Sequence, residues 1–196
     1  MPAEGRRWGW HALDAREAAR LVADAGVGPG DLVVDAGAGA GALTAPLVAA
    51  GARVVAVELH PARAAALRRR FAGASVTVVQ ADVADLRLPR RPFAVVANPP
   101  FAASAALLRR LTAPGTRLTT ATLVLPSWVA RRWATGHAAG AGRWRHTHHA
   151  EVVRRLPRAA FTPPPPGDTA VLVLRRATAG AAAAAGPRPP ARRRRP

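Results

Sequence analysis

The sequence predicts an α/β fold with a doubly wound parallel sheet, and three observations lead to this fold class. Short apolar runs alternate with amphipathic segments of helical period over residues 15–125. A glycine-rich loop at residues 36–41 separates the first apolar run from the next helix, which is the order at the start of nucleotide-binding α/β units. Polar residues follow four of the predicted strands, and parallel strands share the edge at which ligands bind.

The first predicted element is a helix at 15–24, which Asp14 can cap and which the glycines of 26–30 end. Further helices are expected at 42–50, 62–71, 105–111 and from 126 to 133. Strands are expected at 32–35, 53–57, 75–79, 93–97, 117–125, 150–154 and 170–174. The last of these is apolar at odd and even positions alike, so we expect it inside the sheet.

Four polar residues stand at strand ends: Asp35, Glu58, Asp82 and Asn98. An acid after the second strand can accept from the two ribose hydroxyls of an adenosine-type cofactor, which suits Glu58. Asp82 is placed to accept from an adenine amino group. Each residue alone also fits a solvated strand end, but their convergence at one rim favours a cofactor site.

Residues 98–101, in order Asn-Pro-Pro-Phe, end an apolar run abruptly. Asn98 offers an amide oxygen, and Pro99 offers a carbonyl but no N–H. Phe101 supplies a flat face on which a base can stack. Two acceptors beside an aromatic ring fit an exocyclic amino group on a planar ring, so these three residues are the candidate catalytic set. A strand end followed by a proline-rich turn is the simpler alternative.

The charge balance favours a polyanionic partner. The 196-residue chain carries 29 basic and 11 acidic residues, for a net charge of +18, and every basic residue is arginine. Arginine suits phosphate well, and codon bias would explain arginine in place of lysine but not the excess. We expect nucleic acid as partner, with an anionic membrane surface second. The absence of cysteine, of a long apolar run and of a signal-peptide core predicts a cytoplasmic protein without disulfides or thiolate metal sites.

Three segments are less regular. Trp8 and Trp10 form either a lid on the core or a cover over a ligand. Residues 136–145 are rich in Gly, Ala and Arg and are expected to be flexible. His146, His148 and His149 lack a matching carboxylate pattern, so we expect them to be solvated or to face RNA, with no metal. The residues from 177 onwards cannot bury a core, so a disordered tail is expected after a catalytic domain of residues 1–176.

These motifs together resemble the Erm family of 23S ribosomal-RNA adenine N6-methyltransferases, which confer macrolide, lincosamide and streptogramin resistance, and in particular its actinomycete members. The matching stretches lie in the family's order at 33–44, 55–61, 80–82, 96–101 and 161–174. The resemblance implies S-adenosylmethionine as cofactor and a Rossmann-like, seven-stranded sheet whose last strand is antiparallel. It also implies 23S ribosomal RNA as partner, and we expect a monomer.

The resemblance assigns roles to individual residues. Cofactor contacts are implied for Asp35, Gly37, Gly39, Gly41, Leu43, Glu58, Leu59, Asp82, Val83 and Asn98. Asn98 and Pro99 would accept from the target amino group, and Phe101 would stack on the target base. The candidate RNA contacts are Arg131, Arg132, Arg143, Arg145, Arg154, Arg155 and Arg158.

Two departures from the family pattern matter. The family usually carries Gln-Asn-Phe-Leu or a close variant near its N-terminus, where this chain has Gly-Trp-His-Ala-Leu at 9–13. Typical members continue into a helical C-terminal domain, and here an Ala/Pro/Arg-rich segment is expected in its place. Small-subunit rRNA adenine dimethyltransferases, DNA adenine-N6 methyltransferases and protein glutamine-N5 methyltransferases share the Asn-Pro-Pro-aromatic motif and stay open as alternatives. So does an RNA-binding protein that has lost the cofactor.

Overall fold

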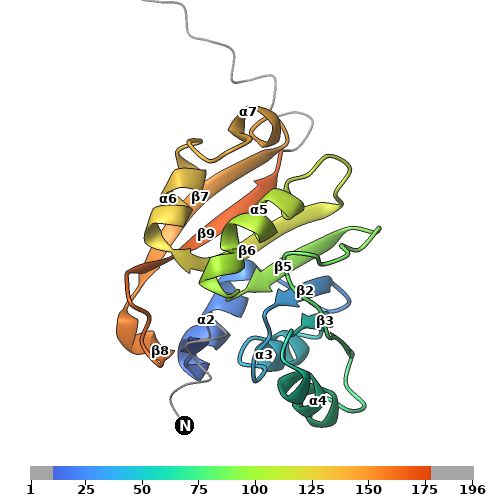
Figure 1. The fold of residues 1–196 in the computed structure, drawn as a ribbon. Coiled ribbons are helices and arrows are strands. Elements are labelled where there is room, and N and C mark those ends of the chain that lie inside the picture. The colour runs from blue at the N-terminus through green and yellow to red at the C-terminus, as the bar shows by residue number, and fades with distance from the viewer. Residues whose placement is uncertain (1–10, 178–196) are drawn as a thin grey trace, which may run out of the picture.

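One seven-stranded sheet organises residues 11–177, the part of the chain that the computed structural model describes (Figure 1). Its strands are β2 (Leu32–Ala36), β3 (Arg53–Val57), β4 (Val76–Val79), β5 (Phe93–Ala97), β6 (Leu118–Pro126), β7 (His148–Leu156) and β9 (Thr169–Arg176). Their order across the sheet is β4-β3-β2-β5-β6-β9-β7. The first five run parallel, and β9 lies antiparallel between β6 and β7. The predicted seven-stranded α/β sheet with an antiparallel last strand is confirmed.

Helices cover both faces of this sheet, so each strand buries two sets of side chains. One face packs against α2 (Ala15–Ala25), α3 (Thr44–Ala49) and α4 (Pro61–Arg70). The other packs against α5 (Ser104–Leu111), α6 (Ser127–Ala134) and α7 (Ala141–Trp144). Val171 faces the first set and Leu172 the second, which confirms the prediction that this strand is interior. No helix in the described part of the chain is long and apolar enough to cross a membrane.

The element boundaries follow local chemistry. The predicted strands at 53–57 and 93–97 coincide with β3 and β5. Helix α2 begins after Asp14, whose side chain accepts from the Glu17 backbone N–H at 2.8 Å. It ends at Gly26, whose φ of 65° is left-handed and therefore favours glycine.

The prediction of a flexible segment at 136–145 is wrong. This segment contains α7, and Trp144 within it is 4% exposed. The Trp144 ring stacks on that of Trp133 with centroids 4.8 Å apart. One large aromatic side chain therefore anchors a stretch whose composition otherwise favours disorder. The predicted N-terminal lid with Trp8 and Trp10, and the tail after Ala177, lie outside the described residues.

A second, two-stranded sheet joins the N-terminal segment to a distant loop. It pairs β1 (Ala12–Leu13) antiparallel with β8 (Phe161–Thr162), which follows the 3-10 turn η2 (Arg158–Ala160). The Asp14 N–H extends the pairing by donating to the Ala160 carbonyl at 2.8 Å. We call residues 11–14 the strap. It was not predicted, because two residues are too few to show a period.

A bulge in β7 re-aims the end of that strand. Val152 pairs with Leu172 and Arg154 with the next residue, Val171, so Val153 has no partner in the pairing with β9. Before the bulge, Ala150 faces α6 and α7; after it, Leu156 packs on the face that α2 covers. An extra residue in one strand reverses which side chains face which layer.

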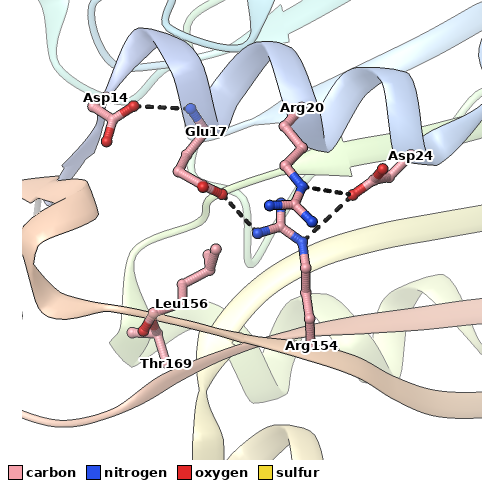
Figure 2. Close-up of polar contacts among 7 residues, drawn as sticks. All are labelled: Asp14, Glu17, Arg20, Asp24, Arg154, Leu156 and Thr169. Atoms are coloured by element: carbon pink, nitrogen blue, oxygen red, sulfur yellow. Dashed lines mark hydrogen bonds and ion pairs between the residues drawn. The ribbon is translucent and has the colours of Figure 1, made fainter.

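Arg154 consequently points at α2, as Figure 2 shows, and not toward solvent. Its Nη1 lies 2.6 Å from Glu17 Oε2, and its Nε lies 3.4 Å from Asp24 Oδ2. Arg20 reaches the same Asp24 carboxylate at 3.9 Å. The expectation that Arg154 contacts RNA is corrected here, since its guanidinium holds β7 to α2.

We predict that Arg154→Ala lowers the free energy of unfolding by about 2–4 kcal/mol, because it leaves the largely buried Glu17 carboxylate without its cation, whereas Asp24 keeps Arg20. Urea denaturation monitored by circular dichroism measures the change. Arg155→Ala is the matched control: the neighbouring side chain is exposed, and its loss should cost less than about 0.5 kcal/mol. Equal unfolding free energies for the two variants would contradict the role assigned to Arg154.

Candidate active site

A cleft opens at the carboxyl ends of the parallel strands and gathers most of the predicted catalytic and cofactor-binding residues. Its volume is about 530 Å³. The loops after β2, β3 and β5, together with the segment after β4, form its walls. The cleft is lined by His11, Gly37, Glu58, Leu59, Arg63, Asp82, Val83, Asn98, Pro99, Pro100 and Phe101. His11 and Arg63 are the two that the sequence did not indicate.

A smaller cavity of about 340 Å³ adjoins the cleft and contains two further predicted cofactor contacts. Asp35 and Leu43 line it, and Gly37 and Asn98 line both spaces. Gly41 lines neither: a Cβ there would lie 2.8 Å from Phe71 Cε2, so its lack of a side chain lets α4 and the residue after it pack against the loop. Gly41 and Gly39 are thus the two predicted cofactor contacts that line neither space.

Gly37 is where the glycine-rich loop touches the Asn-Pro-Pro loop. Its φ is 85°, and a Cβ on it would lie 2.9 Å from Pro100 Cδ and 3.3 Å from Pro99 Cα. Its N–H donates to the Val57 carbonyl at 2.8 Å. Any side chain here would push the two loops apart, so glycine keeps them in contact.

The Glu58 carboxylate is buried, at 4% exposure, and accepts from several donors. Oε2 accepts from the Gly39 N–H at 2.8 Å. Oε1 accepts from the His60 N–H at 2.8 Å and from Arg63 Nε and Nη2 at 3.1 and 3.0 Å. Arg63, near the start of α4, thus turns inward to this carboxylate. Gly39 lines neither space, but its N–H fixes Glu58.

The strap orients the Asn98 amide. Asn98 Nδ2 donates to the His11 carbonyl at 2.7 Å. Because the amide nitrogen is held there, the amide oxygen is the group left to accept from a ligand in the cleft. His11 therefore acts on Asn98 through its backbone carbonyl, so its residue type gives no signal of this contact.

The same histidine also contacts Phe101, the first residue of the 3-10 turn η1 (Phe101–Ala103). The two rings are tilted by 32° with centroids 5.4 Å apart. His11 Nδ1 lies 2.9 Å from the Pro163 carbonyl, and since a carbonyl only accepts, Nδ1 carries a proton. The strap thereby links the Asn-Pro-Pro loop to the loop after β8.

Asp82 and Val83 close the far side of the cleft. Asp82 is exposed, and its Oδ1 accepts from the Ala84 N–H at 2.8 Å, which shapes the turn. A carboxylate has acceptor sites on both oxygens, so this bond leaves Asp82 able to accept from a ligand. Val83 is buried at 4% exposure and offers an apolar wall beside it.

Asp35 lies beneath the glycine-rich loop with one oxygen unsatisfied. Oδ2 accepts from Thr44 Oγ1 at 2.7 Å, whereas Oδ1 is buried and has no partner among residues 11–177. The pKa of Asp35 is raised to about 7, chiefly by burial; the Thr44 hydrogen bond opposes this rise, and the charge of Glu58 adds to it. An orphaned acceptor in this position fits a ligand that brings a cationic or N–H group to the loop.

Six of the seven arginines predicted to bind RNA are exposed, on α6, α7, the start of the following turn, β7 and η2: Arg131, Arg132, Arg143, Arg145, Arg155 and Arg158. His146 and His149 are also exposed, but His148 is 3% exposed, which corrects its expected solvation. Burial, and then the charge of Arg176, lower the pKa of His148. Within the described ranges, no group of three or more His, Asp or Glu side chains is arranged to hold a metal.

The raised pKa of Asp35 predicts a specific pH dependence of stability. The folded chain holds this proton more tightly than the unfolded chain, so stability is lost as pH rises from about 4 to about 7. Asp35→Asn cannot ionise, so its free energy of unfolding should gain on wild type by up to about 1.4 kcal/mol per pH unit in this window. Urea denaturation of both proteins between these limits tests it, and parallel curves would contradict the assignment.

The chain is similar to two ribosomal-RNA methyltransferases. It is 34% identical over 140 residues to an rRNA adenine N-6-methyltransferase of Corynebacterium diphtheriae, covering 70% of this chain and 51% of that protein. It is 36% identical over 132 residues to ribosomal RNA small subunit methyltransferase A of Leifsonia xyli subsp. xyli, covering 63% and 47%. The chain spans about half the length of these curated relatives.

Structure and family comparisons agree with this. The crystal structure of the 23S rRNA methyltransferase ErmE superposes with a TM-score of 0.74 at 31% identity, covering 85% of this chain and 70% of that one. The family model described as ribosomal RNA adenine dimethylase matches residues 13–184. That span contains the whole seven-stranded sheet and, apart from His11 and Ala12, every residue lining the two spaces. The chain therefore belongs to the ribosomal RNA adenine dimethylase family.

Proposed function

We propose that this protein is an S-adenosylmethionine-dependent methyltransferase that acts on N6 of an adenine in 23S ribosomal RNA and confers macrolide, lincosamide and streptogramin resistance. The observation that carries the proposal is the Asn98 amide, which the His11 carbonyl holds by its nitrogen at 2.7 Å. Its oxygen is thereby left beside Pro99 and Phe101 in the cleft. These groups can bind an amino group on an aromatic ring, and membership of the ribosomal RNA adenine dimethylase family supports an adenine of RNA as its source.

The residues around the two spaces fit the cofactor. Glu58 would accept from the ribose, at Oε2 in particular, because Oε1 already takes three donors. Asp82 would accept from the cofactor's adenine amino group. The unsatisfied oxygen of Asp35, below Gly37, would face the charged methionine end. When bound, S-adenosylmethionine supplies a methyl group on a positively charged sulfur, which makes that methyl electrophilic.

The chain's part in the chemistry is to prepare the adenine amino group. The N6 lone pair is delocalised into the ring, so free adenine is a weak nucleophile. If the Asn98 oxygen and the Pro99 carbonyl each accept one N–H, the nitrogen is held toward tetrahedral geometry and its developing positive charge is stabilised. N6 gains the methyl group and releases a proton to water, so no strong base is needed. Phe101 would return about 1–3 kcal/mol of the cost of unstacking the target base.

The choice between 23S and 16S RNA rests on finer similarity. The Erm-type stretches at 55–61 and 161–174 and the likeness to ErmE support 23S RNA. The similarity to small subunit methyltransferase A, at 36% identity, makes an adenine of 16S RNA the second candidate. Both candidates use the same amino-group chemistry, so RNA recognition outside the cleft distinguishes them.

Asn98→Ala should lower kcat by about 10²- to 10³-fold, because it removes one of two acceptors aimed at the reacting nitrogen. The affinity for S-adenosylmethionine, measured by calorimetry, should fall far less, since Glu58 and Asp82 remain. Thr119→Ala is the control: its hydroxyl donates to the Phe93 carbonyl, at the opposite end of β5 from the cleft. Full methylation of ribosomal RNA by Asn98→Ala would refute the assignment of Asn98.

Mass mapping of ribosomal RNA from cells with and without this protein identifies the substrate. We expect one adenine of 23S RNA to gain methyl groups, no change in 16S RNA, and reduced susceptibility to macrolides. The catalytically impaired Asn98→Ala chain, expressed to the same level, is the control for indirect effects. Methylation confined to 16S RNA would establish the second candidate in place of the first.

A further inference from the structure

Trp128 differs from the other tryptophans of the described chain. Trp133 and Trp144 are each 4% exposed and stack on one another in the core. Trp128, on the same helix as Trp133, is 65% exposed. Five residues separate the two along α6, which places them about 140° apart around the helix. The core side of α6 is therefore filled by Trp133, and the Trp128 indole contributes little to folding.

A second cleft lies beside the cofactor cleft, and Trp128 forms part of it. Its volume is about 1120 Å³. A single exposed apolar residue needs no explanation, but here Phe101, Pro126 and Pro166 join the indole in one concave wall. Phe101 also lines the first cleft, so the two spaces meet at the ring proposed to stack on the target adenine.

The polar residues of the second cleft suit a nucleotide. Arg131, one helical turn from Trp128, lines the same space and is exposed. Asp168 also lines it; its carbonyl accepts from the Ser127 N–H at 2.9 Å, and its carboxylate can accept from amino groups on a base edge. An indole with an adjacent guanidinium is the combination that binds single-stranded nucleic acid through stacking and phosphate contact.

We propose that this second cleft binds the nucleotide adjacent to the target adenine in single-stranded RNA, with its base on Trp128 and its phosphate on Arg131. The inference rests on the proposed function, because it takes the target base to be at Phe101. A base turned out of its stack leaves the face of its neighbour uncovered. Trp128 would cover that face, so the chain would hold two consecutive nucleotides, one on each aromatic ring.

Fluorescence anisotropy of a labelled single-stranded oligoadenylate with the full-length protein tests this. Trp128→Ala should weaken binding about 5- to 100-fold, and Trp128→Phe should restore most of it, because any aromatic face can stack. Trp128→Ala should leave the dependence of log K on log salt unchanged. Arg131→Ala should reduce its slope by about 0.7, the loss of one phosphate contact on a single strand.

Val153→Ala is the control for trimming an exposed apolar side chain elsewhere, since Val153 is 45% exposed on β7. It should bind the oligoadenylate as wild type does. Wild-type affinity in Trp128→Ala would overturn the proposal, as would an equal loss in Val153→Ala. So would a change of oligomeric state in Trp128→Ala with RNA binding unaltered, since the indole would then serve a protein contact.

Kinetics separate this inference from the proposed function. Trp128→Ala should raise KM for a methylatable RNA fragment with little change in kcat, whereas Asn98→Ala lowers kcat. A lowered kcat at unchanged KM in Trp128→Ala would overturn the proposal. Oligoadenylate binding requires no methyl transfer. If the wild-type protein methylates no ribosomal adenine, the proposed function is refuted, but the effect of Trp128→Ala on binding is still measured independently.

Discussion

The Glu58 carboxylate is the interaction on which the shape of the site depends. A buried charge is costly unless it is fully hydrogen-bonded, and here the donors come from three parts of the chain. The Gly39 N–H brings the glycine-rich loop to the end of β3, the His60 N–H closes the turn after it, and Arg63 adds the first turns of α4. Satisfying one carboxylate therefore sets the positions of loop, strand end and helix together. The side of the cleft that these segments form is a consequence of that requirement.

The side of the cleft formed by the strap has a different origin. The strap pairs with β8 through two residues, and His11 at its start contacts Asn98, Phe101 and Pro163. Segments that are far apart in the sequence thus meet over the reacting position. The two sides of the site are held by different interactions. Charge and backbone N–H groups hold the side around Glu58, whereas strand pairing, two hydrogen bonds of His11 and a ring contact hold the strap side. Motion of the strap would change the amide orientation before it disturbed the cofactor side.

Much of the fold could be predicted because the strands are continuous apolar runs that end abruptly in polar residues. The same abrupt ends located Glu58, Asp82 and Asn98, since parallel strands bring their carboxyl ends to one edge. His11 could not be found this way, because it acts through a carbonyl that every residue possesses. Nothing in the sequence distinguishes Arg63 from the other arginines of α4, because its contact with Glu58 depends on how the helix packs. Arg154 and Trp144 depended on tertiary structure, on a bulge in one case and on a single stacked ring in the other.

Because of the bulge at Val153, the buried side chains of β7 lie on one face of the sheet before it and on the other face after it. Its first half belongs to the layer of α6 and α7, and its second half to the layer of α2. Deleting Val153 would place Arg154 directly after Val152 and still opposite Val171, so Arg154 and Leu156 would keep the faces they have now. The strand would instead lose the local bend and the added twist that a bulge provides, and with them the approach of the Arg154 guanidinium to Glu17. The extra residue therefore sets the angle of this contact, and its own exposed side chain has no part in it.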